Sequence, residues 1–300
     1  MEVVSLGSGA ELEARFVPSA GMVGCSLRHG GVELLGQRRG LDRYISDRKT
    51  MGIPLLYPWA NRLSAERFEV AGREVVLDAE PPAATPTRDP NGLPMHGLLA
   101  ADSGWRVESA GRDRLRASLD FADRPDLLAA FPFPHLLELE ASVAGSKLTI
   151  AARVTASAGV QVPISFGFHP YLQLPDVPRS EWEIAVPVRT RLVLDERNLP
   201  TGERQDVQVD SGPLGERTFD DAFEAPPQGE PFVLAGGGRR VELRFESGYG
   251  YSQVYAPPDD DVIAYEPMTA PTNALVTAGP ELRLLEPGER YEAVFSIEVH

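Results

Sequence analysis

Several classes of functional site need residues that this sequence lacks. Its 300 residues include one cysteine, Cys25, which excludes an internal disulfide and a cysteine-based metal centre. Cys25 lies in the apolar segment 22–27, so we interpret it as a small core residue rather than a nucleophile. No apolar run approaches the roughly 18 residues of a membrane-spanning helix, and residues 1–7 have an early acid and no basic flank, unlike a signal peptide. A cytoplasmic protein is the simplest interpretation.

Positive charge is scarce as well. The chain carries 29 lysines and arginines against 44 aspartates and glutamates, which gives a net charge of −15. Nucleic acids and anionic membranes are bound through clustered cations, so we expect neither partner. Segment 236–240 lacks the strand–helix setting of a phosphate-binding loop and is interpreted as a hairpin turn. No spacing of histidine, cysteine and aspartate is typical of a metal site, so neither a metal nor another cofactor is expected.

The sequence is rich in turn residues and in period-two alternation. Its 28 glycines and 27 prolines are spread along the chain, which indicates many short elements joined by turns. Apolar and polar residues alternate as in antiparallel strands with one buried face, in segments 115–121, 137–143, 148–154 and 241–245. Because no internal repeat or composition shift divides the chain, residues 1–300 are predicted to form a single all-β domain, a mainly antiparallel β-sandwich.

Local patterns predict several of the connections. Two hairpins are expected, one across 143–148 and one across 68–75 with Ala71 and Gly72 at its turn. Segment 123–130 predicts a short helix with a proline in its first turn. Proline-rich segments predict loops at 81–86 and 226–231.

Two ionisable residues each precede a proline: His169 in Phe-His-Pro and Glu266 in Tyr-Glu-Pro. A residue before proline favours an extended backbone, so we expect both side chains to be presented from stiff, strand-like segments. In such a segment Phe166 and Phe168 point away from the face of His169 and into the core. An imidazole and a carboxylate can supply the acid and the base for chemistry on a hydroxylated substrate. The alternatives are a histidine bonded to a backbone carbonyl and a glutamate paired with an arginine.

Further polar candidates lie in irregular or aromatic segments. His96 lies in a Gly/Pro-rich loop, where binding residues are common, although a solvated loop histidine is equally compatible. Asn61 and Arg62 follow an aromatic stretch, and the guanidinium fork suits vicinal hydroxyls, a carboxylate or a surface salt bridge. Asp220 and Asp221 are consecutive, so within a strand they face opposite ways and only one enters a pocket. The remaining histidines are assigned no role: His29, His135 and His300.

Five short motifs, in order, resemble those of the aldose 1-epimerases, or galactose mutarotases: Pro58-Trp-Ala-Asn-Arg62, His96-Gly97, Gly167-Phe-His-Pro-Tyr171, Phe219-Asp-Asp-Ala-Phe223 and Glu266-Pro-Met-Thr269. The resemblance covers the chain from about residue 50 to 280 and continues in segment 271–275. It implies a β-supersandwich fold and a cofactor-independent isomerase that interconverts the α and β anomers of a free aldohexose.

The resemblance also implies roles for single residues. By similarity, Glu266 would be the general base that takes the proton of the C1 hydroxyl, and His169 the general acid that protonates the ring oxygen. His96 would support that acid or hold the ring-oxygen side of the sugar. Arg62, with Asn61 beside it, and an aspartate would bind sugar hydroxyls; the family's D-x-x-F pattern favours Asp220 over Asp221.

Three other functions stay open at this point. A hexose-6-phosphate mutarotase would need extra cations, for which Arg73, Arg88 and Arg106 are candidates. A noncatalytic carbohydrate-binding sandwich could stack sugars on its tryptophans, Trp59, Trp105 and Trp182. A glycoside hydrolase would pair Glu266 with a second carboxylate, possibly Asp220. The sequence leaves a monomer and a homodimer equally open.

Overall fold

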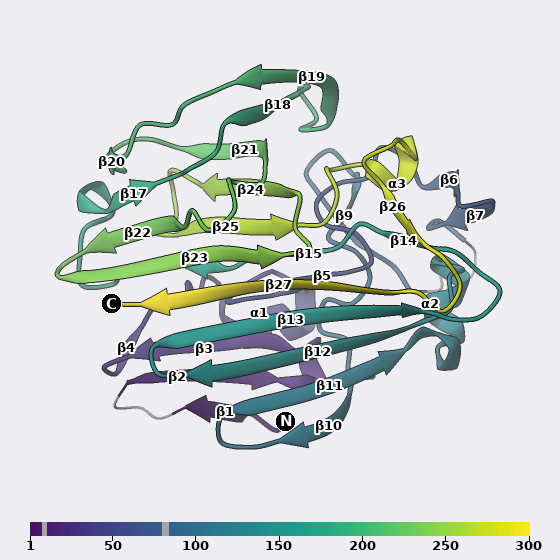
Figure 1. Ribbon diagram of the computed structural model, residues 1–300, viewed down its shortest axis with the longest axis horizontal. Helices are drawn as coiled ribbons and strands as arrows, with labels where there is room; N and C mark the ends of the chain where they lie inside the picture. The colour runs from purple at the N-terminus through teal and green to yellow at the C-terminus, as the bar shows by residue number, and fades with distance from the viewer. Residues whose placement is uncertain (8–10, 80–83) are drawn as a thin grey trace.

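The computed structural model describes residues 1–7, 11–79 and 84–300. Its strands pair antiparallel within every sheet, and its helices are few and short, so the predicted all-β, antiparallel fold is confirmed. Figure 1 shows the long strands β11, β12, β13, β27 and β23 running side by side, with a second sheet of shorter strands next to them.

The larger sheet has nine strands. In spatial order these are β10 (Arg106–Ala110), β11 (Arg114–Asp120), β12 (His135–Ala144), β13 (Lys147–Ala156), β27 (Arg290–Val299), β23 (Arg239–Ser247), β22 (Phe232–Gly236), β17 (Glu183–Ala185) and β20 (Gly212–Pro213).

The second sheet carries most of the polar candidates from the sequence. Its strands, in spatial order, are β19 (Pro200–Asp206), β18 (Thr190–Leu194), β21 (Phe219–Glu224), β24 (Tyr251–Ala256), β25 (Ile263–Met268), β15 (Gly167–Phe168) and β5 (Leu55–Leu56), with β16 (Tyr171–Leu172) also paired to β25.

Smaller elements complete the chain. The strands are β1 (Val4–Gly7), β2 (Leu12–Val17), β3 (Val23–His29) and β4 (Val32–Glu33) in one sheet, and the pairs β6 (Arg67–Val70) with β7 (Arg73–Val76), β8 (Thr87–Arg88) with β9 (Pro94–Met95), and β14 (Val162–Ile164) with β26 (Arg283–Leu285). The helices are α1 (Gly40–Asp47), α2 (Pro125–Ala130) and α3 (Ala274–Thr277), with single 3₁₀ turns at Pro18–Ala20, Phe121–Asp123 and Arg179–Glu181. No helix in the described ranges is long and apolar enough to cross a membrane.

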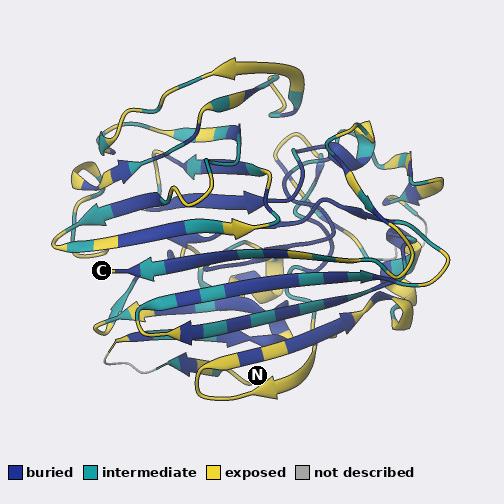
Figure 2. Cartoon of the chain, in the orientation of Figure 1, coloured by how far each residue is buried: buried dark blue, intermediate teal, exposed yellow. Residues whose placement is uncertain are grey.

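The core lies between the two large sheets. The Tyr265 hydroxyl of β25 donates to the Val233 carbonyl of β22 at 2.6 Å, and the Tyr265 ring stacks on Phe232 with centroids 4.9 Å apart. Phe168 of β15 meets Phe295 of β27 at 5.1 Å. Strands β12 and β13 of the nine-stranded sheet largely alternate buried and partly exposed residues (Figure 2), whereas segment 241–245 of β23, expected to alternate, has three consecutive buried residues. The alternation in β12 and β13 is what the sequence pattern predicted.

The expected local elements are found where the structure describes them. The hairpins β12–β13 and β6–β7 turn at Gly145 and at Ala71–Gly72, and both turn glycines have positive φ. Helix α2 starts with its proline, and segment 226–231 lies between β21 and β22. Residues 81–83 of the other predicted loop lie outside the described residues. Helix α1, by contrast, was not predicted. It is eight residues long, and Tyr44 is its single buried residue.

Strand β25 is buried along its whole length, unlike the alternating strands. Its Tyr265 face packs into the core, so its other face, which carries Glu266, must be covered by other elements. Directly opposed residues of antiparallel strands share a face, and register places Glu266 opposite Gln253 of β24 and Gln253 opposite Ala222 of β21. The candidate site lies on this covered face.

Candidate active site

Glu266 and His169, far apart in the chain, lie against each other in the structure. The Glu266 Oε1 and His169 Nε2 atoms are 3.1 Å apart, and the two side chains are only 2% and 6% exposed. Glu266 sits within β25, as expected, whereas His169 lies in the short link between β15 and β16 rather than within a strand. An acid–base pair is therefore assembled in a nearly dry environment.

The backbone and an aromatic neighbour fix the His169 ring. The His169 N–H donates to the Pro54 carbonyl at 3.2 Å, and the imidazole stacks on Tyr171 with centroids 4.0 Å apart and planes at 19°. Phe166 and Phe168 are buried in the core, as the alternation predicted. The ring is therefore held by packing, and its Nδ1 has no hydrogen-bond partner among the described residues.

Segment 57–62 connects the loops that carry the candidates. The Ala60 N–H donates to the Ser165 carbonyl at 2.7 Å, and the His96 N–H donates to the Asn61 carbonyl at 2.9 Å. Asn61 and His96 both have left-handed backbones, with φ of 58° and 63°. Such conformations cost energy for non-glycine residues and are common at functional sites. Next to His96, a Cβ at Gly97 would lie 2.1 Å from the Tyr57 carbonyl oxygen, so only glycine allows the two segments to approach this closely.

Arg62 is partly buried within a polar network rather than in a surface salt bridge. Its side chain is 12% exposed, and its Nε donates to Asp89 Oδ2 at 3.0 Å. Its Nη1 donates to Asn61 Oδ1 at 2.7 Å, and its Nη2 lies 3.9 Å from Asp220 Oδ2. The Asn61 amide thus orients the guanidinium, which faces Asp220 across the site.

Asp220, not Asp221, faces the candidate site. Asp220 accepts a hydrogen bond from Gln253 Nε2 at 2.7 Å and one from Asn198 Nδ2 at 3.2 Å. Asp221 points to the other face of β21, where it pairs with Arg191. The two aspartates diverge because consecutive strand residues alternate sides.

Burial shifts the pKa values of the central groups in opposite directions. Desolvation raises the pKa of Glu266 well above its usual value, and nearby Asp220 adds to the effect while Arg62 opposes it. Desolvation lowers the pKa of His169 well below its usual value, helped by His96 and Arg38. Desolvation, with Arg62, also lowers the pKa of His96 to about 3. The ligand-free site therefore favours neutral groups, with one proton held by the Glu266–His169 pair.

Unpartnered polar atoms gather around this pair. His96 Nδ1, His169 Nδ1, Glu266 Oε2 and Gln253 Oε1 are all buried without a hydrogen-bond partner among the described residues. The ring of His96 lies 5.8 Å from that of His169. An unsatisfied buried polar group costs roughly 1–3 kcal/mol, so this cluster is arranged to exchange hydrogen bonds with a polar ligand.

The histidines without an assigned role lie away from this cluster. His135 is buried among aromatic rings, where its Nδ1–H donates to the Phe133 carbonyl at 2.6 Å and its Nε2 accepts from the Tyr57 hydroxyl at 2.5 Å. His29 ends β3 before a glycine turn, and His300 is the last residue.

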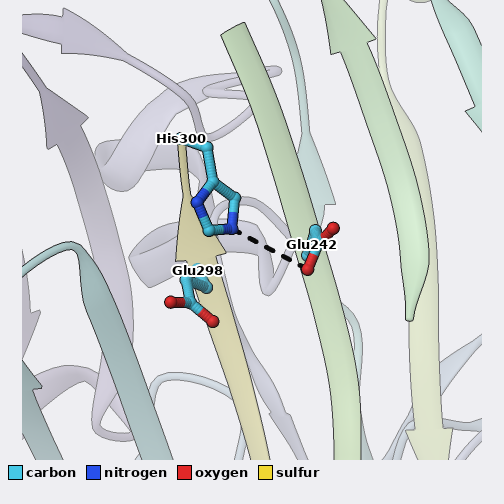
Figure 3. A group of neighbouring side chains, drawn as sticks. All are labelled: Glu242, Glu298 and His300. Atoms are coloured by element: carbon cyan, nitrogen blue, oxygen red, sulfur yellow. Dashed lines mark ion pairs between the residues drawn. The ribbon is translucent and has the colours of Figure 1, made fainter. Parts of the chain in front are cut away.

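One group of side chains has the composition of a metal site. Figure 3 shows Glu242 on β23, Glu298 near the end of β27 and His300 just after that strand, with His300 Nε2 3.8 Å from Glu242. Arg240 and Arg244 already pair with the Glu242 carboxylate and neutralise it. We therefore assign no cation to this group.

Three cavities lined by described residues do not include Glu266 or His169 in their walls. One of about 630 Å³ is lined by segments 185–189 and 206–209, and another of about 270 Å³ lies between β19 and α3. A third, of about 260 Å³, shares Asp220 and Asn198 with the candidate site. The candidate site is therefore assigned from its convergent ionisable groups, Glu266, His169 and His96, rather than from the volume of a cavity.

Several residues of the site, Asn198 among them, were not predicted from the sequence. Gln253 donates a hydrogen bond to Asp220, and Asp89 accepts one from Arg62. Tyr255 packs edge-on against His169, and Arg38 packs on the Tyr171 ring. Gln253 lies opposite Glu266 in register, but register cannot be read from a single strand. Asp89 could have been noticed in Asp-Pro-Asn-Gly, a typical turn sequence, although that signal indicates a turn and not a contact with Arg62.

The arginines considered for phosphate binding make contacts elsewhere. Arg73 donates to the Pro132 carbonyl, Arg88 pairs with Glu66 and Arg106 pairs with Glu108. Arg62 and Arg38 are the arginines whose described contacts involve the candidate site.

Comparison with known proteins identifies relatives of the chain. The family model described as aldose 1-epimerase matches residues 3–298. A search of curated protein sequences found no match. Among solved structures, a galactose mutarotase-like protein from Clostridium acetobutylicum is similar with a TM-score of 0.82 at 16% identity, over 100% of this chain and 98% of that one. The Slr1438 protein from Synechocystis sp. PCC 6803 has a TM-score of 0.78 at 23% identity, over 99% and 95%. The galactose 1-epimerase from Lactobacillus acidophilus NCFM has a TM-score of 0.74 at 13% identity, over 99% and 93%. At these identities the structures show a shared fold.

Proposed function

The chain belongs to the aldose 1-epimerase family, and from this premise we propose that it is a mutarotase, an isomerase that interconverts the α and β anomers of a free aldohexose. The observation that supports this most strongly is the buried contact of 3.1 Å between Glu266 Oε1 and His169 Nε2. A hemiacetal opens when a base removes the O1 proton while an acid protonates the ring oxygen, which is the work such a pair can do.

In the proposed reaction, the Glu266 carboxylate accepts the O1 proton and the His169 imidazolium gives its proton to O5. The C1–O5 bond breaks as the C1–O1 carbonyl forms, which leaves an open-chain aldehyde. Rotation about C1–C2 presents the other face of the carbonyl, and O5 attacks it while the two proton transfers run in reverse. Each cycle returns the protein to its starting protonation state.

A shared proton makes this pair suited to a reversible reaction. Burial disfavours both the doubly protonated pair, which is cationic, and the fully deprotonated pair, which is anionic. The remaining single proton can reside on Oε1 or on Nε2, and the carboxylate–imidazolium form contains the base and the acid that ring opening needs. Ring closure uses the same two groups with their roles exchanged.

The surrounding polar groups are proposed to bind the sugar hydroxyls. Arg62 offers a planar guanidinium already oriented by Asn61, and Asp220 offers carboxylate oxygens opposite it. The unpartnered Gln253 Oε1 can accept a hydroxyl proton, and His96 is placed to support His169. Bidentate contacts of this kind suit vicinal hydroxyls on a pyranose.

Binding without catalysis would not need the buried acid–base pair, which costs desolvation energy that a binding module could avoid. A phosphorylated hexose would need cations beyond Arg62, and the arginines considered for that role make contacts elsewhere. Glycoside hydrolysis would need Asp220 as a second catalytic carboxylate, but this side chain is 40% exposed and accepts hydrogen bonds from two amides. The free aldohexose is therefore the preferred substrate.

Polarimetry of freshly dissolved α-glucose and α-galactose tests the proposal. The expected result is a relaxation rate that rises linearly with protein concentration above the buffer rate, with no product other than the other anomer by NMR. A disaccharide incubated in parallel should release no free monosaccharide. If neither sugar relaxes faster than in buffer at micromolar protein, the proposed function is wrong.

A further inference from the structure

Arg38 lies beside the candidate site although no sequence motif indicates it. Its guanidinium carbon is 4.6 Å from the centre of the Tyr171 ring and 5.9 Å from the centre of the Tyr255 ring. Its Nε donates to Asp260 Oδ2 at 2.8 Å, and these two side chains are 24% and 32% exposed. A cation on an aromatic face is held more firmly where water is partly excluded.

The Tyr171 ring connects this cation to His169. Its centre lies 4.0 Å from that of the imidazole, with the planes at 19°, so the guanidinium carbon is within about 9 Å of the imidazole centre. The Tyr171 hydroxyl bonds to Thr50 Oγ1 at 2.7 Å, and its backbone N–H donates to the Gly52 carbonyl at 2.9 Å. Hydrogen bonds of the Tyr171 hydroxyl and of the Tyr171 backbone N–H therefore fix the ring in this stack.

We propose that Arg38 is a positioning residue that controls, through the Tyr171 ring, how readily His169 releases its proton. The inference rests on the proposed function, in which His169 is the acid that protonates the ring oxygen. A positive charge near an imidazole disfavours the imidazolium, so Arg38 makes protonated His169 a stronger acid. Asp260 opposes Arg38, because its carboxylate neutralises part of that charge.

Other groups also face His169 and affect the balance between its neutral and protonated forms. Glu266 from β25 lies 3.1 Å from the imidazole and favours its protonated form. His96, with ring centres 5.8 Å apart, disfavours that form, and Tyr255 contacts the imidazole edge-on at 5.6 Å. The charge of Arg38 can be removed without removing any group assigned to substrate.

The test measures, by NMR titration, the pH midpoint at which the His169 imidazole is protonated. It uses one variant that loses a positive charge and one that loses a negative charge. Arg38→Met removes the cation and keeps the aliphatic packing, so the midpoint for protonation should rise by about half to one pH unit. Asp260→Asn leaves Arg38 uncompensated and should lower the midpoint. Arg39→Met removes the same charge one residue away and is the matched control, expected to shift the midpoint by less than about 0.2 unit because exposed charges are screened. The titration is repeated in a Glu266→Gln background, so that proton sharing does not mask the shift.

Activity adds a second measurement. The limb of the kcat/KM pH profile that reports His169 should move in the same direction as the NMR midpoint, upward for Arg38→Met and downward for Asp260→Asn. An unmoved midpoint in both variants, or an equal shift in Arg39→Met, overturns the inference. If the midpoints move as expected but the wild-type protein fails to accelerate mutarotation, the Arg38 coupling stands and the proposed function fails instead.

Discussion

The properties of this protein that matter for chemistry arise from single side chains held in low-dielectric surroundings. Glu266 and His169 have ordinary side chains whose acid–base behaviour is changed by burial, because desolvation disfavours the charged form of each. The Arg62 guanidinium donates hydrogen bonds to Asp89 and Asn61, which fix its orientation. The burial of Glu266 and His169 leads to measurements on variants of these two residues and on the pH profile of the wild-type protein.

Replacing Glu266 with Gln, or His169 with Asn, should lower kcat for anomer interconversion by about 10²–10⁴-fold, because each change removes one proton-transfer group and leaves a neutral amide in its place. Polarimetry gives kcat, and isothermal titration should show sugar binding within a few-fold of wild type. Asp221→Asn is the matched control, since Asp221 faces away from the site and pairs with Arg191. Wild-type kcat in either catalytic variant would contradict the assigned roles.

The kcat/KM of the wild-type protein should be bell-shaped in pH with a broad plateau. Below the plateau the pair gains a second proton, and because burial lowers the pKa of His169, the acid limb should lie below pH 6.5. Above the plateau the pair loses its only proton, and because burial raises the pKa of Glu266, the alkaline limb should lie well above pH 4.5. The measurement is the enzymatic relaxation rate after subtraction of buffer catalysis. An acid limb centred above pH 6.5 would show that the imidazole is not held neutral.

At the scale of elements, short strands and tight loops place these side chains. Strand β15 pairs with β25 on one side and with β5 on the other, and it ends one residue before His169. Segment 57–62 is hydrogen-bonded to the loop that carries His96. The spacing between β15 and β25 depends on Gly167, where a Cβ would lie 2.6 Å from the Pro267 carbonyl oxygen and 3.1 Å from Ala60 Cβ. The position of His169 therefore depends on the absence of a side chain two residues before it.

Gly167→Ala should destabilise the protein by roughly 1–3 kcal/mol, because the added methyl meets backbone atoms that cannot move aside easily. The β15–β25 contact would open, so kcat should fall together with the thermal midpoint. Differential scanning calorimetry and polarimetry on the same sample check both effects. Gly250→Ala is the matched control, since a Cβ there meets nothing within 4 Å. Equal melting temperatures for Gly167→Ala and Gly250→Ala would mean that the strands tolerate a wider spacing.

At the scale of the whole molecule, stability depends on the shared core of the two sheets and on buried groups that must stay neutral. His135 lies in an aromatic cluster, with its ring 4.1 Å from that of Phe121. Burial lowers its pKa to about 4, although its bond to the Phe133 carbonyl opposes the shift. An unfolded chain has a histidine pKa of about 6.5 and therefore takes up a proton before the folded chain does.

Stability should consequently fall as the pH drops from about 6.5 to 4. In this window the unfolded state binds more protons at His135, so its contribution is complete above pH 6.5 and is lost progressively on the way to pH 4. The difference of about 2.5 pKa units corresponds to roughly 3 kcal/mol for this residue. Denaturant unfolding at several pH values measures it, with His135→Phe as the variant that cannot gain the charge. The unfolding free energy of that variant should depend less steeply on pH. An unchanged slope would place the titration at groups other than His135.

The sequence by itself determined the class of fold and the main candidates for the site. Period-two alternation in β12 and β13 is a local property of the chain, because neighbouring strand residues face opposite sides. The Glu266-Pro and His169-Pro pairs could be singled out for a similar reason, since proline constrains the backbone immediately before it. Helix α1 was missed because it is only eight residues long, and so short a segment gives a weak periodic signal.

Only the tertiary structure decided which side chains meet. The contact of Glu266 with His169 and the presence of Gln253 and Arg38 follow from strand register and from loops that cross the sheet. These contacts join residues that are distant in sequence, and no local pattern encodes such pairings. The shifted pKa values belong to this level too, because desolvation is a property of the packed surroundings rather than of the residue.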